Sequence, residues 1–367
     1  MKMTVTALLQ KQEASLNHSE RLPSWRPFLI SEQRPEDMPG FEIMPTRTIA
    51  PELKGIVPEQ APDIMPWLAV PKHALSWFEL PETHPAKQAL RRAQPHQWRI
   101  RQEMLSLPAI MAIWNVTPDS FSSSADADDA ASTAHAERLL REGADILDIG
   151  AESTRPDAEP ISSEIEIARL EGNFVWATQQ KTRISLDSWR LETIRQFAEK
   201  IDILNDIGRA YKDEAQSKAI FELVRKHGLG YVLMAYHEHT HQFSSYSDCI
   251  REIIVQLDAR LGSAFEANVD MSQLVVDPGI GFGKGLENDL ILMVHGAEDL
   301  ACLGRPVVIA HSRKRCLGLA TERPIKERDT ATAIGAALAF EHGASLVRVH
   351  DPRGARDALQ LLRAAQH

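Results

Sequence analysis

The chain has 367 residues, 43% of them hydrophobic and 25% charged, which is ordinary globular composition and enough for one large domain with an appendage or for two domains. The formal net charge of −10 disfavours broad nucleic-acid binding and a polybasic membrane anchor, although a few basic side chains can still hold an anionic small molecule. Three widely spaced cysteines, the lack of a signal-peptide pattern at residues 1–12 and the lack of an apolar run of about 20 residues favour a cytoplasmic protein without disulfides or a membrane span.

Residues 1–107 differ from the rest of the chain because prolines recur throughout them. Proline removes a backbone donor, so long helices and central strands are not expected before Pro85. Six aromatic side chains are nevertheless too apolar for a solvated tail: Trp25, Phe28, Trp67, Trp77, Phe78 and Trp98. We predict a proline-rich, mostly irregular N-terminal extension that packs its aromatic residues on the main domain or on a partner subunit.

From residue 108 onward, short apolar runs alternate with longer amphipathic segments, as in repeated βα units. We expect strands at residues 109–115, 145–150, 183–187, 201–206, 230–234, 273–277, 306–310 and 345–350. We expect helices at residues 126–142, 163–180, 191–199, 213–227, 247–267, 287–303, 324–342 and 353–365. Gly143, Gly228 and Gly343 are placed to end helices, and Pro324 suits the first turn of one.

The number and order of these elements predict an α/β fold in which residues 108–367 form a (β/α)₈ TIM barrel, a fold of about 250 residues. A doubly wound open sheet is the structural alternative. Against it, no G-x-G-x-x-G motif follows the first expected strand.

Charged or amide side chains stand at or just after the carboxyl ends of all the expected strands except the fifth. They are Asn115, Glu152, Arg155, Asp187, Asn205, Asp206, Asp277, Arg313, Lys314, Arg348, His350 and Asp351, and the hydroxyl residues Thr154 and Ser312 stand among them. Because the functional residues of such barrels gather at this end of the strands, we predict a polar active site there. The alternative is an ion network in the barrel core, which is costly to assemble unless the charges pair with one another or with a ligand.

The types of these residues suggest a division of labour. Asp187, Asn205 and Asp277 offer two carboxylates and an amide, which suit a flat heterocycle that presents N–H donors and acceptors. Lys314 and Arg348 offer positive charge for an anionic group such as a phosphate. Asn115 offers a neutral oxygen that can ligate Mg²⁺, a hard ion that keeps most of its waters.

The chain from about residue 108 to residue 351 resembles dihydropteroate synthase. The matching motifs are N-V-T-P-D-S-F-S at 115–122, G-A-D-I-L-D-I-G-A-E-S-T-R-P at 143–156, I-S-L-D-S at 184–188, N-D-I at 205–207, D-P-G-I-G-F-G-K at 277–284, S-R-K at 312–314 and R-V-H-D at 348–351. The resemblance implies a TIM barrel that joins 6-hydroxymethyl-7,8-dihydropterin diphosphate to 4-aminobenzoate, giving 7,8-dihydropteroate and diphosphate in folate biosynthesis. It also suggests a homodimer.

The resemblance further implies a role for each matching residue, with Asp187, Lys314, Arg348 and His350 as the catalytic ones. The residues that it places around the pterin are Asp187, Asn205, Asp277, Lys314, Phe282 and Met234. The residues that it places near the diphosphate and Mg²⁺ are Asn115, Arg348 and His350, with Thr154 and Arg155 nearby. The residues that it places near 4-aminobenzoate are Phe121, Pro156, Ser312 and Lys314.

The sequence departs from the family pattern in several loops. Residues 123–129 contain no glycine where the family has Asp-Gly-Gly, and Asp157 follows the second motif where the family often has Gly. The loop after the fifth expected strand contains His237, His239 and His241, whose spacing raises the alternative of a zinc site. A modified pocket wall is the simpler interpretation, because no carboxylate stands at a fixed spacing from these histidines.

Two other functions compete with synthase activity. A methyltetrahydrofolate-dependent methyltransferase would share the Asp and Asn residues for the pterin but should lack S-R-K and R-V-H-D, which are both present. A non-catalytic pterin-binding homologue would explain the altered loops, yet the residues expected to contact diphosphate are all retained.

Overall fold

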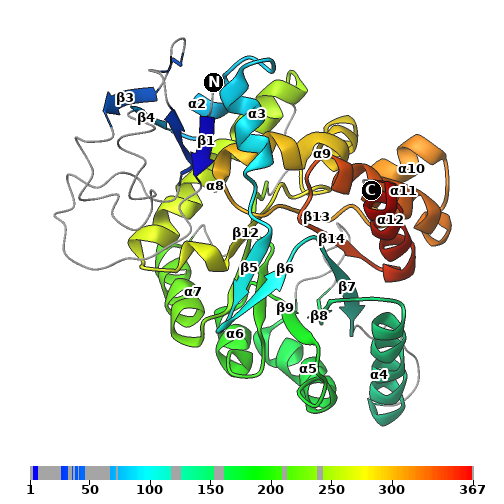
Figure 1. Ribbon diagram of the computed structural model, residues 1–367. Coiled ribbons are helices and arrows are strands. Elements are labelled where there is room, and N and C mark those ends of the chain that lie inside the picture. Colours follow the sequence, from blue (N-terminus) through cyan, green and yellow to red (C-terminus); the bar gives the residue numbers. More distant parts are fainter. Residues whose placement is uncertain are drawn as a thin grey trace.

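The computed structural model describes residues 3–6, 26–31, 35, 38–39, 41–45, 67–71, 73–116, 125–152, 161–208, 213–237 and 243–365. At its centre, eight parallel strands are ordered β12-β11-β10-β9-β8-β7-β14-β13 (Figure 1). Their bounds are β7 Ala109–Asn115, β8 Ile146–Gly150, β9 Arg183–Asp187, β10 Ile203–Asp206, β11 Gly230–Met234, β12 Leu274–Asp277, β13 Val308–Ile309 and β14 Leu346–Val349. A parallel bridge between Val276 and Val307 joins the two ends of this order, so the sheet forms a nearly closed barrel. The predicted TIM-like barrel is confirmed.

Helices surround the barrel, one or more after each strand (Figure 1). They are α4 Ala125–Arg141, α5 Ser163–Ala177, α6 Leu191–Phe197, α7 Glu214–His227, α8 Tyr246–Glu266, α9 Leu286–Asp299, α10 Arg315–Thr321, α11 Asp329–Glu341 and α12 Pro352–Ala365, with the 3₁₀ turns η4 Met271–Gln273, η5 Leu300–Leu303 and η6 Ile325–Glu327. Capping follows the sequence at α7, where the Asp213 carboxylate accepts from two backbone N–H groups and Gly228 adopts φ 66°. Within the described part of the chain, no helix has the length and apolar character needed to cross a membrane.

One helix boundary was predicted wrongly. The helix expected at residues 324–342 begins only at Asp329, because Pro324 stays extended with ψ 158° and a 3₁₀ turn follows it. The Arg328 side chain donates to the carbonyls of Arg313 and Lys314 and so ties this turn to the loop after β13. The short helix α10, which lies before it, was not predicted.

The described part of the N-terminal region contains more regular structure than the proline content suggested. Four antiparallel strands are ordered β1-β2-β4-β3, with bounds β1 Met3–Thr6, β2 Phe28–Ser31, β3 Phe41–Pro45 and β4 Trp67–Pro71. The expectation that central strands are absent before Pro85 is therefore wrong. The reason is that Pro45 and Pro71 stand at the ends of their strands, where a missing N–H group interrupts no hydrogen-bond ladder.

Buried tryptophans pack within the N-terminal region and between it and the barrel. After the sheet come α2 Leu75–Phe78, α3 Pro85–Arg92 and the hairpin strands β5 Gln97–Ile100 and β6 Glu103–Ser106. Trp77 is fully buried, and its indole N–H donates to the Pro27 carbonyl at 2.8 Å. Trp98 is also fully buried, and its indole N–H donates to the Gln273 carbonyl at 2.7 Å. The side chains of Trp25, Phe28 and Trp67 lie outside the described residues.

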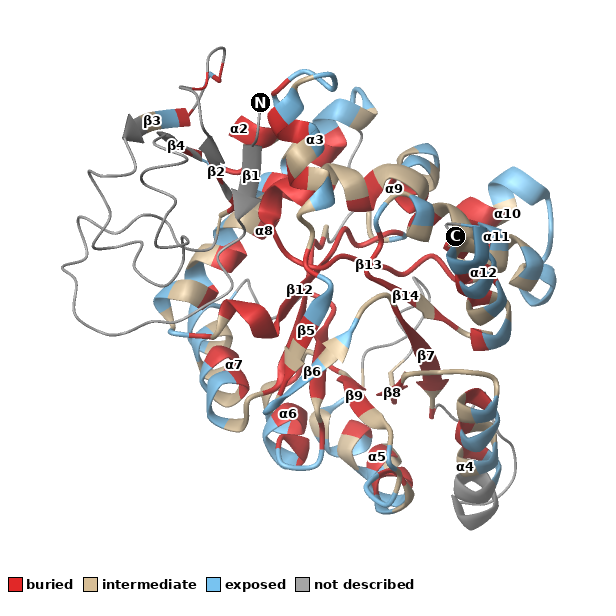
Figure 2. Cartoon of the chain, viewed as in Figure 1, coloured by how far each residue is buried: buried red, intermediate tan, exposed pale blue. Residues whose placement is uncertain are grey.

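The β5–β6 hairpin closes the amino-terminal end of the barrel. Trp98 and Ile100 pack against the inward-facing residues of the barrel strands, which are Ala109, Met111, Ile146, Ile203, Val232, Val275, Val308 and Leu346. Gly230 leaves the space that the indole occupies, since a Cβ there would lie 2.8 Å from the Trp98 ring. The buried strands and the hairpin lie together at the middle of the molecule in Figure 2.

Replacing Trp98 by Ala should lower the free energy of unfolding by about 3–5 kcal/mol, because the change leaves a cavity beneath the barrel core. Chemical denaturation followed by circular dichroism measures this loss. The matched control is Met104→Ala on the partner strand β6, whose side chain is 41% exposed and whose loss should cost no more than about 0.5 kcal/mol. Equal losses for the two variants would contradict the role given to Trp98.

Candidate active site

The carboxyl ends of neighbouring parallel strands bring the predicted polar residues together. Asp187 ends β9, Asn205 is the third residue of β10 and Asp277 ends β12. In the strand register, Asn205 lies opposite Asp187, and Met234 at the end of β11 lies opposite Asp277. Arg348 on β14 reaches this group by its contact with Asp187.

A guanidinium held between two carboxylates stands at the centre of the site. Arg348 Nη2 donates to Asp187 Oδ2 at 2.5 Å, and Arg348 Nε donates to Asp148 Oδ2 at 2.6 Å. The same Asp148 oxygen accepts from Asn205 Nδ2 at 3.0 Å. These contacts connect four barrel strands and fix the direction of the guanidinium through charge-assisted hydrogen bonds.

Asp148 was not among the predicted site residues. It is the third residue of β8, a strand in which every residue is buried, and its side chain is fully buried. A carboxylate in the middle of an apolar strand was the signal in the sequence, because a buried charge requires a partner. Its partner, Arg348, lies 200 residues away in the sequence, so only the fold identifies the pair.

Burial shifts the ionisation of this group. Burial, together with the nearby carboxylates, raises the pKa of Asp187 to about 7, although Arg348 opposes this rise. Burial lowers the pKa of the Arg348 guanidinium, but Asp148 and Asp187 outweigh that effect and hold it above its ordinary value. Asp187 therefore ionises near neutral pH, which lets it donate or accept a hydrogen bond according to the ligand.

The glycine-rich loop after β12 carries the next part of the site. Gly279 has φ 72°, and a Cβ there would lie 2.0 Å from the Ala235 carbonyl oxygen, so no other residue fits. The almost fully buried Lys284 donates to the carbonyls of Ala235, Gly279 and Phe282 at 3.0, 2.9 and 3.1 Å. Lys284 therefore holds the loop in place, and burial lowers its pKa to about 8.

Lys314 and Asp277 approach this loop from the barrel. Lys314 donates to the Ile280 carbonyl, and its Nζ lies 5.0 Å from the centroid of the Phe282 ring. Asp277 Oδ1 accepts from the Gly279 backbone N–H at 2.6 Å. Burial raises the pKa of Asp277 and lowers the pKa of Lys314, so each needs a partner of opposite charge to stay ionised.

Ser312 fixes the orientation of the His350 ring. The His350 backbone N–H donates to Ser312 Oγ at 3.1 Å, and Ser312 Oγ lies 2.9 Å from His350 Nδ1. The Ser312 hydroxyl can donate to an unprotonated Nδ1 or accept from a protonated one, so this contact orients the ring in either tautomer. Burial lowers the pKa of His350 to about 3, so the ring is a neutral N–H donor.

The middle residue of the S-R-K motif has a different function. Arg313 forms a bidentate pair with Asp329 at the start of α11, with N–O distances of 2.6 and 2.8 Å. It therefore braces the loop after β13 rather than joining the central cluster. From the sequence, Lys314 was assigned a role at the site and Arg313 none, and the pair that Arg313 forms with Asp329 was not predicted.

A second buried ion pair holds Glu152, which lies just after β8. Arg190 forms a bidentate pair with Glu152 at 2.8 Å for both contacts, and Trp189 Nε1 donates to the same carboxylate at 3.3 Å. Glu166 Oε2 lies 3.6 Å from Arg190 and accepts from Thr193 at 2.6 Å. Arg190 and Glu166 were not predicted as site residues. Arg190 pairs with both Glu152 and Glu166 and so holds Glu152 in place.

Two further predicted residues stand at strand ends near the cluster. Asn115 ends β7, where it is partly exposed and lies opposite Gly150 in the register. Met234 is buried with Ile207 and Tyr236, and Phe282 packs against this group.

Four of the predicted site residues lie outside the described residues: Phe121, Thr154, Arg155 and Pro156. His239 and His241 also lie outside them, while His237 packs its ring at 5.6 Å from the Phe243 ring.

Comparison with known proteins gives a consistent result. The family described as pterin binding enzymes matches residues 111–350. The dihydropteroate synthase of Neisseria meningitidis serogroup B is 38% identical over 281 residues, which cover 73% of this chain and 97% of that protein. The Xanthomonas albilineans dihydropteroate synthase solved with 4-aminobenzoic acid is 33% identical with a TM-score of 0.67, covering 74% and 98% of the two chains. The structure of that enzyme in complex with 7,8-dihydropteroate is 32% identical with a TM-score of 0.64, covering 73% and 98%.

The raised pKa of Asp187 predicts a measurable dependence of stability on pH. Folding raises this pKa from 3.8 to about 7, so ionisation of the carboxyl disfavours the folded state. The resulting stability is complete below about pH 4 and is lost as the pH rises through about 7. The stability of the ligand-free protein relative to Asp187→Asn should therefore fall between about pH 4 and pH 7, as urea denaturation measures. Parallel pH profiles for the two proteins would contradict the assignment.

Proposed function

The chain is a transferase of the dihydropteroate synthase family of pterin-binding enzymes, and from this we propose how its residues join 6-hydroxymethyl-7,8-dihydropterin diphosphate to 4-aminobenzoate. The single observation that carries the proposal is the cluster at the carboxyl end of the barrel. There Arg348 is held by two carboxylates, beside Asn205, and the neutral His350 follows it by two residues, just after the end of the same strand, β14. The methyltransferase and non-catalytic alternatives lose their support, because the relatives reported above are synthases over nearly their whole length.

The pterin binds, in this proposal, between the carboxylates and the glycine-rich loop. Asp187 and Asp277 accept from ring N–H groups, and Asn205 adds an amide that can both donate and accept. Phe282 offers an aromatic face to the flat ring, and Met234 forms part of the pocket wall. The deep burial of Asp277 supports this role, because a buried carboxylate that has a ligand as its partner is less costly than an unpaired one.

The diphosphate binds beside Arg348 and His350. Arg348 uses Nε and Nη2 for its two carboxylates, which leaves Nη1 for a phosphate oxygen. In this proposal the Ser312 hydroxyl donates to Nδ1 of the neutral His350 ring, which then offers its Nε2–H to the phosphate without gaining charge. Thr154 and Arg155, which the resemblance places nearby, complete this region in our proposal.

Magnesium fits the donor at the end of β7. Asn115 supplies one amide oxygen at a partly exposed position, and Mg²⁺ commonly takes one protein ligand with waters and phosphate oxygens. When bound, the ion would neutralise negative charge that develops on the diphosphate.

The reaction needs stabilisation of the leaving group more than a strong base. The bond between the exocyclic carbon of the pterin and the diphosphate oxygen breaks, and the electron pair leaves with diphosphate. The amine nitrogen of 4-aminobenzoate forms the new bond to that carbon and then loses a proton. In our proposal Lys314, Arg348 and His350 stabilise the developing charge, Asp187 orients the pterin, and Phe121, Pro156, Ser312 and Lys314 surround the aminobenzoate.

We also propose that the protein is a cytoplasmic homodimer. Four exposed apolar side chains are Leu319 on α10, Ile325 on η6, Ile334 on α11 and Leu361 on α12. The helices α10, α11 and α12 lie next to one another at one side of the barrel (Figure 1). Such a concentration on one side suits a subunit interface.

The three cysteines are free and buried, which suits a reducing compartment. The division into an extension at 1–107 and a barrel domain at 108–367 is likewise our proposal.

The residue roles are tested by steady-state kinetics of diphosphate release with Mg²⁺ and both substrates. Asp187→Ala and Lys314→Ala should each reduce turnover or pterin affinity at least about tenfold, on the order of 1.4 kcal/mol or more. The matched control is Lys181→Ala, an exposed lysine between α5 and β9 at the other end of the barrel, which should keep wild-type kinetics. Wild-type kinetics for Asp187→Ala and Lys314→Ala would show that the site lies elsewhere.

The proposed interface is tested by sedimentation velocity. Ile334→Glu places a charge on a side chain that is 58% exposed, so the wild-type protein should sediment as a dimer and the variant as a monomer. The matched control is Val175→Glu on α5, a side chain that is 66% exposed, which should remain dimeric. A monomeric wild-type protein, or an Ile334→Glu dimer of unchanged affinity, would rule out this interface.

A further inference from the structure

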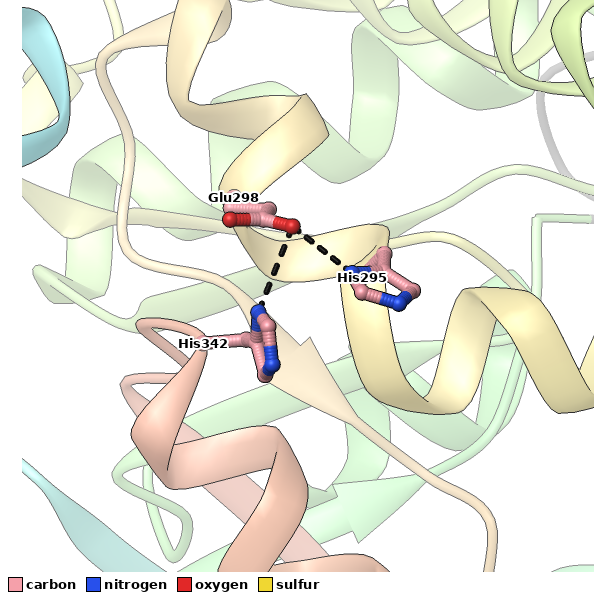
Figure 3. Close-up of side chains that lie close together, drawn as sticks. All are labelled: His295, Glu298 and His342. Carbon is pink, nitrogen blue, oxygen red and sulfur yellow. Dashed lines mark hydrogen bonds and ion pairs between the residues drawn. The ribbon is translucent and has the colours of Figure 1, made fainter. Parts of the chain in front are cut away.

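Two helix ends bring a second group of metal-ligating side chains together, away from the active site. His295 and Glu298 lie in the last turn of α9, and His342 caps the carboxyl end of α11. Figure 3 shows both imidazoles directed at the same carboxylate. His295 Nδ1 lies 2.7 Å from Glu298 Oε1, and His342 Nδ1 lies 3.2 Å from that oxygen.

The distances in this cluster suit a transition-metal ion. Each of the three residues offers one ligand atom, and these atoms all lie within 4.8 Å of one another. Among the described residues, this is the one group of three or more His, Cys, Asp or Glu side chains that meets this distance. A tetrahedral zinc ion with bonds of about 2.0–2.1 Å places its ligand atoms about 3.3 Å apart. Shifts of less than about 1 Å in exposed or half-exposed side chains would therefore open the cluster around an ion.

The surroundings favour a cation as well. Both α9 and α11 end at the cluster, and the carboxyl end of a helix carries partial negative charge. Arg91 of α3 approaches the other oxygen, Oε2, at 3.8 Å and leaves Oε1 to the two histidines. Arg91 would repel a bound cation, but the negative charge of the Glu298 carboxylate and of the two helix ends attracts it.

We propose that His295, Glu298 and His342 form a binding site for a divalent transition metal such as Zn²⁺. Two imidazole nitrogens and one carboxylate oxygen are a ligand set that such ions prefer, whereas Mg²⁺ prefers oxygen ligands alone. Because both helices run antiparallel to the barrel strands, the site lies at the amino-terminal end of the barrel, opposite the active site. A bound ion would fasten α9 to α11 and stabilise that end.

The test is isothermal titration of chelator-treated, tag-free protein with ZnCl₂, together with thermal unfolding. The wild-type chain should bind one Zn²⁺ with micromolar or tighter affinity, and the melting temperature should rise. His342→Ala and Glu298→Gln should each weaken binding at least tenfold and remove the rise, while diphosphate-release kinetics stay unchanged. The buried cysteines should not compete, since burial raises the pKa of Cys249 and Cys316 to about 11 and zinc binds thiolates.

A matched control separates this site from the other histidine-rich segment. The double variant His239→Ala/His241→Ala should keep wild-type affinity for Zn²⁺. Loss of binding in that double variant, equal affinity in His342→Ala and Glu298→Gln, or no wild-type binding below millimolar Zn²⁺ would each overturn the proposal.

A titration of the wild-type chain with Co²⁺ gives an answer that does not depend on variants. Visible absorption that saturates at one equivalent supports a low-coordinate site with histidine ligands. A spectrum that stays that of the hydrated ion contradicts it.

Discussion

The burial of one guanidinium between two carboxylates is the interaction on which the active end of this barrel depends. Asp148 is fully buried in the middle of a strand, and without a cation its charge would be expensive to hold there. Arg348 supplies that cation and also donates to Asp187. The side-chain amide of Asn205 donates a further hydrogen bond to Asp148. The contacts link side chains of β8, β9, β10 and β14, so residues that are far apart in the sequence form one ordered group at the active end of the barrel.

The two ends of the barrel have different physical tasks. At the carboxyl end, glycine at 279 lets the backbone approach the Ala235 carbonyl, and Lys284 holds the loop by three carbonyls. This leaves Lys314 free to face the ring of Phe282. At the amino-terminal end, Trp98 packs against the inward-facing residues of the barrel strands and closes the core. Chemistry and stability are therefore carried by different residues, which allows loops at the active end to vary while the barrel keeps its closure.

Local sequence predicted most of the fold, and long-range contacts account for what it missed. Apolar runs predicted β7 and β11 with their observed bounds, because buried parallel strands are often continuously apolar. The bounds of β9, in which Ile184 and Leu186 alternate with polar residues, were also predicted as observed. Asp148 was not predicted as a site residue, because its partner Arg348 lies 200 residues away in the sequence. The contact between His342 and Glu298 also joins two different helices, so it could not be predicted from either helix alone. The N-terminal strands were missed because proline content was weighed without regard to position in the strand. The roles implied for Phe121, Thr154, Arg155 and Pro156 remain predictions.

A double-mutant cycle between Asp148 and Arg348 tests the central claim most directly. The quantity measured is kcat/KM for dihydropterin diphosphate in Asp148→Asn, Arg348→Lys and the double variant, each checked for folding by circular dichroism. If Asp148 acts by holding Arg348, the double variant should lose no more activity than Arg348→Lys alone. Losses that multiply, so that the double variant is weaker by the product of the two single effects, would contradict the account.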